Sequence, residues 1–423
     1  MSQPVVLVLA GGVSSRFWPL RDKLLIEFGS QSLLERHLRA LSDLGCDHII
    51  VVTRPDLADT VSKLGDGIAA DVRVALQSEA KGMADAVLCA RPALESYGDC
   101  SIYITQAHDL VERRLHADLL LEWSHRTSSV AGIIAAARVA SYFPGGYLTL
   151  DGIRVASVVE KPGAGNEPSD LVNLVAHLHG SWRTLTDAIK AEVQQGNLDD
   201  AYERALTGLM QASEYIPHIY EGRWQGLKYP WHLLDVMDLM LDLWTRGAES
   251  PGGGYEQRED GVFLAPDVRI FPGGYVAAPA LIGPGCVIGN NALVRGSIMG
   301  PGCVAGFGSE VARSFLAGDV ELHHNYVGDS VFDRGSSMGF GATTANYRID
   351  GRTVPSMVGG ERIDSQRMKL GLMLGAGTKV GVNTSTMPGV KIGANAMIGP
   401  GMRVTRDVPD GERVLDESKY GRF

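Results

Sequence analysis

The sequence predicts two domains in series: a Rossmann-like α/β domain over residues 1–247 and a left-handed parallel β-helix with a hexapeptide repeat over residues 255–423. Two observations predict this arrangement. Strand and helix patterns alternate along the first half, and a period of six residues replaces them in the second half. The length of 423 residues agrees with this division, because it exceeds that of one ordinary domain.

Short apolar runs alternate with helical spacings in the first half. We expect strands at residues 5–9, 48–53 and 101–105, and helices at residues 32–44, 84–94 and 230–244. This βαβα order with short connections predicts a mostly parallel sheet covered on both faces. The run Glu-Ser-Pro-Gly-Gly-Gly at residues 249–254 predicts the linker between the domains.

The second half repeats every six residues. Apolar residues followed by glycine stand at Ile282 and Ile288, and the spacing continues near the end at Leu374, Val380, Thr386, Ile392, Ile398 and Val404. A helix repeats every 3.6 residues and a strand every two, so neither explains this period. It predicts stacked coils whose apolar residues point inward, whereas a disordered glycine-rich tail would lack the periodic Ile and Val. Residues 346–368 lose the period and carry charge, which predicts a functional loop.

Composition excludes several classes of protein. The formal charge of −10 argues against nucleic-acid binding, which needs a basic surface. The five cysteines are widely spaced without a CxxC pair, so we expect a reducing, cytoplasmic setting. No stretch has the length of a membrane span, and no signal peptide is evident.

A glycine-rich turn follows the first predicted strand. Gly11 and Gly12 would expose backbone N–H groups at the carboxyl edge of the sheet, where phosphates bind, and Arg16 and Lys23 would add positive charge. A tight turn with two surface cations is the plainer alternative. The turn predicts a phosphate site only together with other motifs.

Those motifs follow in order along the first half. They are the stretch 77–86 (Gln-Ser-Glu-Ala-Lys-Gly-Met-Ala-Asp-Ala), an aspartate at Asp109, and a segment from Tyr147 that ends in Glu160-Lys161-Pro162. Their order resembles the sugar-phosphate nucleotidyltransferase family. The resemblance implies that Gln77 and the Gly82 backbone face the nucleobase, that Asp109 binds the metal, and that Glu160, Lys161 and Asn173 contact the sugar phosphate.

The first half departs from the family pattern at several positions. Ser14, Leu24, Met83 and His108 replace the usual Gly, Pro, Thr and Gly, and the segment 225–230 around Gly226 offers no second acidic ligand. Mg²⁺ is usually held by one or two carboxylates plus phosphates, so the loss of one would weaken its binding. A nucleotidyltransferase fold retained without its chemistry is therefore the alternative.

The second half contains a local motif of its own. Residues 321–330 read Glu-Leu-His-His-Asn-Tyr-Val-Gly-Asp-Ser, and an Asn-Tyr pair stands at Asn346-Tyr347. The chain thereby resembles the bifunctional UDP-N-acetylglucosamine pyrophosphorylase / glucosamine-1-phosphate N-acetyltransferase family, in its archaeal-type branch. The resemblance implies that His323 is the catalytic histidine, that Tyr326 and Arg352 contact the sugar phosphate, and that Asn346 and Tyr347 lie beside acetyl-CoA. Ser337 stands where that family has an Asn.

Acetyl transfer needs a base for the amine and donors for the thioester oxyanion. His323 can accept a proton near neutral pH, and backbone N–H groups at the coil corners can serve the oxyanion. Two adjacent histidines on an extended chain would point to opposite sides, which argues against a metal site and makes His324 an internal control. A pair of surface or inter-subunit histidines is the alternative.

The sequence therefore predicts a bifunctional enzyme that acetylates a hexosamine-1-phosphate with acetyl-CoA and couples the product to an NTP, with UTP as the first choice and with Mg²⁺. The resemblance also implies a homotrimer, in which the faces of the prisms pack side by side. Two alternatives stay open: an enzyme in which one half works, and a non-catalytic regulatory subunit of the same architecture. The base and the sugar are not specified by the sequence.

Overall fold

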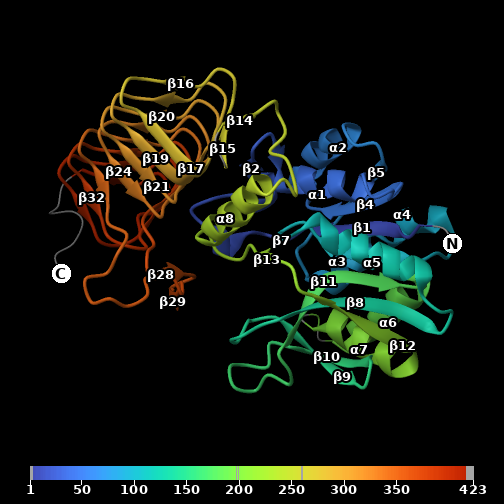
Figure 1. Cartoon of the computed structure of the whole chain (residues 1–423). Helices are drawn as coiled ribbons and strands as arrows, with labels where there is room; N and C mark the ends of the chain where they lie inside the picture. Colours follow the sequence, from blue (N-terminus) through green and yellow to red (C-terminus); the bar gives the residue numbers. More distant parts are fainter. Residues whose placement is uncertain (1–2, 197, 199, 259–260, 416–423) are drawn as a thin grey trace. The chain divides into compact units, whose positions relative to one another are not determined.

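The computed structural model describes residues 3–196, 198, 200–258 and 261–415 (Figure 1). The chain forms two compact units. The first comprises Met1–Val13 and Leu34–Trp224, and the second comprises Ser14–Leu33 and Gln225–Phe423. The segment after the first strand is therefore grouped with the C-terminal half of the chain.

A nine-stranded sheet forms the centre of the first unit, with the order β10-β9-β11-β6-β1-β4-β5; β8 also pairs with β11, and β12 pairs with β8. Its strands are β1 (Val5–Ala10), β4 (His48–Thr53), β5 (Asp71–Leu76), β6 (Ile102–Gln106), β8 (Val130–Arg138), β9 (Gly146–Asp151), β10 (Arg154–Glu160), β11 (Leu171–His179) and β12 (Glu214–Tyr220). The strands predicted at residues 5–9, 48–53 and 101–105 are confirmed as β1, β4 and β6.

The prediction of a mostly parallel sheet is wrong, because this sheet is mixed. Strands β1, β4, β5 and β6 pair in parallel, but β11 runs antiparallel to β6, β8 and β9, and β9 pairs antiparallel with β10. The turn between Asp151 and Arg154 is too short for the crossover that a parallel pair needs. The family-like segment from Tyr147 to Glu160 is accordingly a hairpin.

The helices of the first unit are α1 (Leu33–Ser42), α2 (Ala58–Asp66), α3 (Met83–Cys89), α4 (Arg91–Leu94), α5 (Arg113–His125), α6 (Trp182–Val193) and α7 (Ala201–Ala212). The helix predicted at residues 84–94 is divided into α3 and α4 at Ala90. Pro92 explains the break, because it has no N–H to continue the helical hydrogen bonds. A core of buried residues that includes Leu7, Ile104 and Trp182 holds sheet and helices together.

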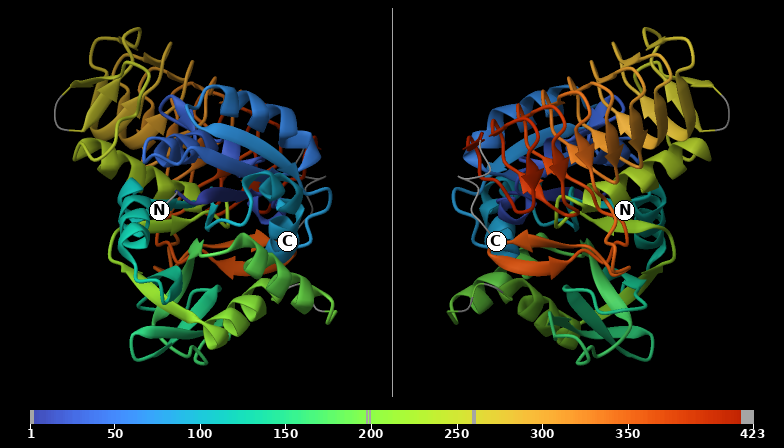
Figure 2. Two further views of the ribbon diagram at one scale, coloured as in Figure 1. Left: turned by 90° about the vertical axis from the view of Figure 1, so that its right-hand side faces the viewer. Right: turned by 90° about the vertical axis from the view of Figure 1, so that its left-hand side faces the viewer.

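The second unit is a solenoid of short strands in two sheets, which pair in parallel except for the first strand, antiparallel to its neighbour (Figures 1 and 2). One sheet contains β14 (Glu256–Arg258), β15 (Val262–Leu264), β17 (Tyr275–Ile282), β19 (Leu293–Met299), β21 (Glu310–Ala312), β22 (Phe315–Leu316), β24 (Tyr326–Gly328), β25 (Val331–Phe332), β27 (Thr343–Thr344), β30 (Met373–Leu374), β32 (Ser385–Thr386), β33 (Lys391–Ile392) and β35 (Arg403–Val404). The other contains β16 (Arg269–Ile270), β18 (Val287–Ile288), β20 (Val304–Ala305), β23 (Glu321–Leu322), β26 (Ser337–Met338), β31 (Lys379–Val380), β34 (Met397–Ile398) and β36 (Arg413–Val414).

Each coil of the solenoid pairs with the next one. Val287 pairs with Val304, and Val304 pairs in turn with Glu321. The residues of the six-residue period are all buried, from Ile282 and Ile288 to Leu374, Val380, Thr386, Ile392, Ile398 and Val404. The prediction of stacked parallel coils around one apolar column is therefore confirmed, and this column forms a single core.

One excursion leaves the solenoid where the sequence loses its period. Strands β28 (Pro355–Val358) and β29 (Glu361–Asp364) form an antiparallel hairpin that projects from the coils (Figures 1 and 2). The chain returns where it departed, because the Leu370 N–H donates to the Asn346 carbonyl at 2.9 Å. The excursion can thus be inserted without disturbing the stack of coils.

The second unit also contains α8 (His232–Thr245) and the segment 14–33, with β2 (Glu27–Phe28) and β3 (Gln31–Ser32). Near its start, the Trp18 indole N–H donates to Asp410 Oδ1 at 2.8 Å, and Arg21 pairs with the same carboxylate at 2.9 Å. The rings of Phe28 and Phe315 lie 5.0 Å apart. The segment is thereby fastened to the solenoid at both ends.

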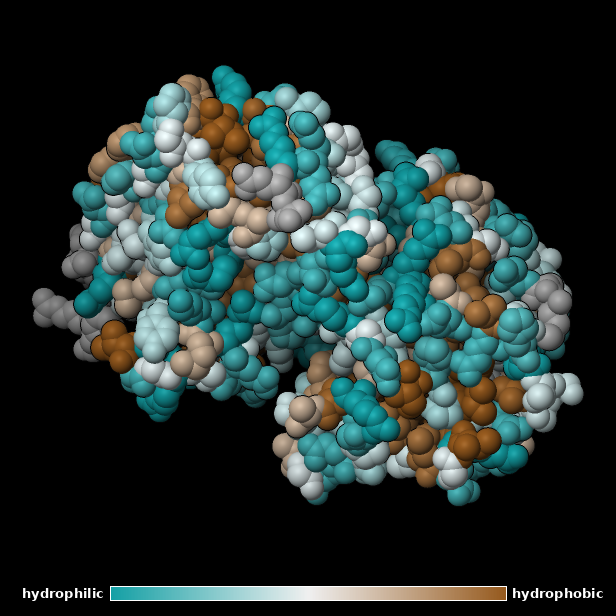
Figure 3. Space-filling view, in the orientation of Figure 1, coloured by the Kyte–Doolittle hydropathy of each residue, from teal (hydrophilic) through white to brown (hydrophobic). Residues whose placement is uncertain are grey.

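Hydrophilic side chains cover most of the face shown in Figure 3, and hydrophobic residues form small separate groups on it. Among the residues that the structure describes, no helix is long and apolar enough to cross a membrane.

Candidate functional site

Gly11, which follows β1, is packed tightly against Gln77, which follows β5. A Cβ at Gly11 would lie 2.2 Å from Gln77 Oε1, so only glycine fits there. The amide of Gln77 is buried, and its Nε2 donates to the Gly82 carbonyl at 3.1 Å and to Asp85 Oδ2 at 2.8 Å. Three residues of the predicted nucleotide site are therefore in one contact network, with Gly12 exposed beside it.

The sugar-phosphate residues predicted in the first half of the chain also gather at one place, around the start of β9. A Cβ at Gly146 would lie 3.2 Å from Glu160 Oε2 and 3.6 Å from the Cβ of Asn173. Lys161 has a positive φ of 43° and pairs with Glu160 at 2.8 Å. The hairpin and β11 thus bring Glu160, Lys161 and Asn173 together.

These two groups lie at the same edge of the sheet. Strands β1, β5 and β6 end there, and the antiparallel β11 begins there, because Ala176 pairs with Thr105 near the end of β6. Asp109 begins the short strand β7 (Asp109–Val111) just after β6. The carboxyl edge of a parallel sheet is where such folds bind ligands.

A buried histidine holds Asn173 from behind. His177 Nε2 lies 2.8 Å from Asn173 Oδ1, and His177 Nδ1 lies 2.9 Å from the Tyr202 hydroxyl. Burial lowers the pKa of His177 to about 3, so the ring is neutral at pH 7 and has one N–H. Because Asn173 Oδ1 can only accept, Nε2 donates to it and the Tyr202 hydroxyl donates to Nδ1.

Glu203 on α7 lies near Glu160, one of the predicted sugar-phosphate residues. Burial raises the pKa of Glu203 to about 7, and the negative charge of Glu160 acts in the same direction. The carboxyl of Glu203 can therefore change its protonation state close to neutral pH.

Arg16 and Lys23 fall in the second unit, on two short 3-10 helices, η1 (Ser15–Phe17) and η2 (Lys23–Leu25). The Arg16 side chain is exposed, and Lys23 Nζ donates to the Leu227 carbonyl at 3.0 Å. Both follow Gly12 closely in sequence, so cationic residues continue the glycine-rich turn.

The acidic residues fit a magnesium ion held largely by substrate. Within the described residues, no three His, Cys, Asp or Glu side chains come together as a metal cluster. Asp109 supplies one carboxylate at the carboxyl edge of the sheet. This suits Mg²⁺, which commonly takes one or two carboxylates and completes its shell with phosphates and water.

In the solenoid, the backbone of His323 is held by a buried asparagine. Asn325 Oδ1 accepts from the His323 N–H, while Asn325 Nδ2 donates to the carbonyls of Gly339 and Ala342, both at 2.8 Å. The side chain of His323 is exposed. Asn325 therefore fixes the turn that presents the imidazole.

The expected alternation of the two histidines is wrong, because they lie in a turn between β23 and β24. His324 has a positive φ of 55°. Its ring stacks between Phe307 and Phe340, with centroid distances of 5.8 and 5.0 Å. His324 differs from His323 through this aromatic stack and not through strand alternation.

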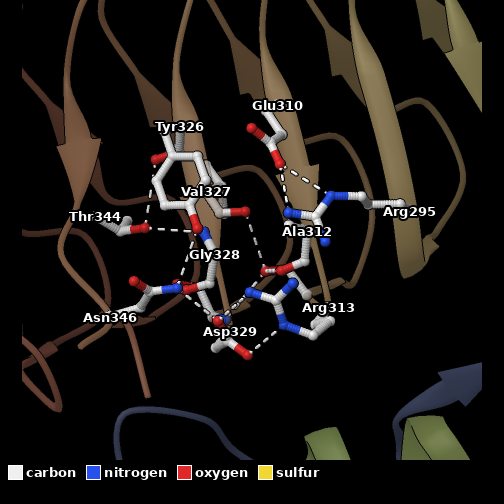
Figure 4. Close-up of polar contacts among 12 residues, drawn as sticks. Arg295, Glu310, Ala312, Arg313, Tyr326, Val327, Gly328, Asp329, Thr344 and Asn346 are labelled. Carbon is white, nitrogen blue, oxygen red and sulfur yellow. Dashed lines mark hydrogen bonds and ion pairs between the residues drawn. The ribbon is translucent and has the colours of Figure 1, made fainter. Parts of the chain in front are cut away.

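Tyr326 and Asn346 are in direct contact, and Figure 4 shows them in a larger network. Asn346 Nδ2 lies 3.1 Å from the Tyr326 hydroxyl and 2.6 Å from Asp329 Oδ2. Asp329 is buried and forms a bidentate pair with Arg313, at 2.8 and 2.7 Å. Across the described part of the chain, the His323 ring makes no hydrogen bond to this network.

Tyr347 and Arg352 stand on the excursion. Tyr347 is half exposed, and Lys369 pairs with it where the chain returns. Arg352 pairs with Asp350 at 2.8 Å, and Arg348 pairs with the same carboxylate. The pKa of Asp350 is therefore held below its ordinary value, mainly by Arg348. Arg352 shares its partner and stays exposed.

Sequence reasoning missed the residues that hold the others in place. Asp85, His177, Asn325 and Asp329 contact predicted site residues but were not predicted to do so. A signal existed for three of them, because Asp85 lies within the stretch 77–86, and Asn325 and Asp329 lie within the motif at residues 321–330. His177 lies outside these motifs, and no sequence pattern marked its contact with Asn173.

Known proteins are similar to this chain in both of its halves. Residues 6–142 match the family model of the MobA-like NTP transferase domain. The bifunctional sugar-1-phosphate nucleotidylyltransferase/acetyltransferase of Sulfurisphaera tokodaii is 30% identical over 420 residues, which cover 96% of this chain and 98% of that protein.

Two further relatives are described as bifunctional protein GlmU. The protein of Methanocaldococcus jannaschii is 26% identical over 429 residues, covering 95% of each chain. The protein of Mycolicibacterium vanbaalenii is 26% identical over 210 residues, covering 47% of this chain and 42% of its own. Similarity to the first two relatives therefore runs through both units.

Proposed function

Because the chain belongs to the family of bifunctional sugar-1-phosphate nucleotidylyltransferase/acetyltransferases, we propose that it catalyses two consecutive reactions. It acetylates a hexosamine-1-phosphate with acetyl-CoA, and it couples the product to an NTP, with UTP as the first choice. The similarity over 96% of the chain carries this proposal, because it spans the folds that both reactions need.

In the acetyl transfer, His323 accepts a proton from the substrate ammonium. The freed amine attacks the thioester carbonyl, and the new N–C bond forms. The nitrogen then gives up a second proton as the C–S bond breaks, and the thiolate takes up that proton and leaves as CoA. Backbone N–H groups at the coil corners stabilise the oxyanion. Tyr326 and Arg352 bind the sugar phosphate, and Asn346 and Tyr347 lie beside acetyl-CoA. The buried clamp by Asn325 supports this assignment, because a general base must be held in position.

In the nucleotidyl transfer, a phosphate oxygen of the sugar phosphate attacks the α-phosphorus of the NTP, and pyrophosphate leaves. Gly11, Gly12, Arg16 and Lys23 hold the triphosphate, and Gln77 and Gly82 lie at the base. Glu160, Lys161 and Asn173 hold the sugar phosphate. Asp109 would hold Mg²⁺, whose positive charge would offset the negative charge of the phosphates.

The proposal extends to architecture. The coils wind with a left hand, the chemistry divides between residues 1–247 and 255–423, and three copies assemble through the solenoid. Small flat faces favour side-by-side packing of prisms. Sedimentation should give a trimer at micromolar concentration, and a 45.3 kDa monomer would contradict it.

One assay separates the proposal from its alternatives. Purified protein is given acetyl-CoA with glucosamine-1-phosphate or galactosamine-1-phosphate, and CoA release is followed. The N-acetylated sugar phosphates are then given with a panel of NTPs and Mg²⁺, and pyrophosphate release is followed. Release of both products supports the bifunctional enzyme. Release of one alone supports the single-activity enzyme, and release of neither supports a non-catalytic subunit.

A further inference from the structure

Asp329 is a buried carboxylate in the solenoid that the proposed acetyl transfer does not use. Its side chain is 3% exposed, and Arg313 on the preceding coil holds both of its oxygens. The hydrogen bond to Asp329 also raises the pKa of the Arg313 guanidinium above its ordinary value. Both Asp329 oxygens therefore accept hydrogen bonds from Arg313, and a carboxylate paired with arginine in this way offers neighbouring groups only acceptor sites.

This acceptor determines which way the Asn346 amide faces. The amide atom 2.6 Å from Asp329 Oδ2 must be the NH₂ group, because a carbonyl oxygen there would face a carboxylate oxygen. The same NH₂ group donates to the Tyr326 hydroxyl at 3.1 Å. The carbonyl oxygen of Asn346 therefore points away from Asp329 and Tyr326, as Figure 4 shows. No hydrogen bond from a described residue reaches it.

Gly328 makes this arrangement possible. A Cβ at Gly328 would lie 2.5 Å from the Tyr326 hydroxyl and 2.6 Å from Asn346 Nδ2. Its N–H donates to the Thr344 hydroxyl at 3.0 Å, which ties it to the next coil. The Gly-Asp pair of the motif thus has a physical purpose: glycine leaves the space, and aspartate supplies the acceptor.

We propose that Asp329 is a positioning residue, which turns the Asn346 amide so that its carbonyl oxygen accepts a hydrogen bond from the amine of the amino-sugar phosphate. The inference rests on the proposed acetyl transfer, because it names the atom that meets the substrate amine. The Tyr326 hydroxyl accepts from Asn346, so its own proton is left to donate to a sugar hydroxyl or phosphate oxygen. The site thereby offers one acceptor to the amine and one donor to the oxygen-rich part of the substrate.

A neighbouring pair gives a matched control. Arg295 and Glu310 form another arginine–carboxylate pair one coil earlier, in which two nitrogens of Arg295 donate to the single oxygen Glu310 Oε1, at 2.9 and 2.7 Å (Figure 4). Their side chains are 39% and 34% exposed, and neither contacts Asn346. Glu310→Gln should therefore leave acetyl transfer within about twofold of the wild type, since exposed ion pairs contribute little.

The decisive test exchanges the two polar partners in the full-length protein. Asp329→Asn frees the Asn346 amide to turn, and we expect kcat/KM for acetyl transfer to fall about 10²-fold. Asn346→Asp places two carboxylates together and should lower kcat/KM at least as far.

The double variant D329N/N346D should restore the arrangement. The amide introduced at position 329 can donate to one oxygen of the carboxylate introduced at position 346, and the other oxygen of that carboxylate again faces the substrate. Activity should return to within about tenfold of the wild type. A double variant no better than either single variant would overturn the proposal.

Two readouts separate this inference from the proposed function. Pyrophosphate release by the nucleotidyl half should be unchanged in Asp329→Asn, whereas a general folding defect would lower both activities and contradict a positioning role. The second readout needs no activity. NMR of protein labelled with ¹⁵N at asparagine side chains should find slow solvent exchange of the Asn346 NH₂, and at least tenfold faster exchange in Asp329→Ala. Equal rates would refute the orientation, even if the wild type proves inactive in acetyl transfer.

Discussion

The two candidate sites are held in different ways. In the α/β unit, Asn173 is fastened by His177, which is itself fully buried, and Gln77 is fastened through Asp85. In the solenoid, Tyr326, Asn346 and Asp329 fasten one another across neighbouring coils. The difference has a consequence for mutation. Changes in this network of the solenoid should remain local and affect one reaction, whereas changes behind the α/β site should also alter stability.

The largest expected effect is in the solenoid. His323→Ala should lower the rate of CoA release by about 10²–10⁴-fold, because a positioned base contributes about that much. Pyrophosphate release from N-acetylated sugar phosphate and NTP should be unchanged, because the turn of His323 is held by Asn325 and not by its imidazole. The measurement is a pair of steady-state assays on one preparation.

His324→Ala is the control for this prediction. It removes the ring between Phe307 and Phe340, so it should lower thermal stability and cost far less activity. If both histidine variants lose acetylation equally, His323 is a structural residue and not the general base.

The next effect is in the α/β unit. Gly11→Ala brings a methyl group within 2.2 Å of Gln77 Oε1, and Gln77 cannot move without breaking its bonds to Gly82 and Asp85. We expect kcat/KM for the NTP to fall about 10²-fold, as for a misplacement near 1 Å. Gly12→Ala meets open space and should cost much less. Equal losses in the two variants would mean that the contact with Gln77 is unimportant.

Glu203 tests the claim that the α/β site is coupled to stability. A raised pKa means that the folded state favours the protonated carboxyl, so its contribution is complete below pH 4.5 and is lost as pH rises toward 7. Glu203→Gln should remove this loss and raise the free energy of unfolding at pH 8 by up to about 3 kcal/mol. At pH 4 the variant should match the wild type. Urea unfolding at the two pH values measures both, and an equal difference at each pH would contradict the assignment.

The smallest effect concerns the orientation of Asn173. His177→Phe removes the donor to its Oδ1, and we expect KM for the sugar phosphate to rise about tenfold, since the loss of one buried hydrogen bond costs about 1–3 kcal/mol. CoA release should be unchanged. Tyr202→Phe removes only the hydroxyl behind His177 and should have a smaller effect of the same kind. A fall in CoA release in either variant would show that the two sites are not independent.

The solenoid could be predicted in detail because its period is local. Each apolar residue of the six-residue repeat points inward wherever the coil continues, so Ile288 and Val404 were placed without knowing their neighbours. The mixed sheet could not be predicted in the same way. The direction of β11 depends on pairing with β6 and β8, which lie far away in sequence, and no local pattern states it.

The site residues that were predicted stand in local motifs, whereas contacts between separate coils were missed. Tyr326 and Asn346 stand in motifs, but Arg313 meets Asp329 only because the coils stack in register. His324 shows the opposite failure. Adjacent residues alternate only on an extended strand, and its left-handed backbone in the turn removed the basis of that prediction.

The contact of Trp18 and Arg21 with Asp410 bears on how the protein can be taken apart. The glycine-rich run at residues 249–254 invites a cut into two separately expressed fragments. Such a cut would leave Arg16 and Lys23 on the N-terminal fragment while removing Asp410 and Phe315, the solenoid residues to which their segment is fastened. The bond of Lys23 to the Leu227 carbonyl would remain, but Trp18 would be uncovered and Arg21 would lose its partner. Truncation would therefore underestimate the nucleotidyl activity of the intact chain.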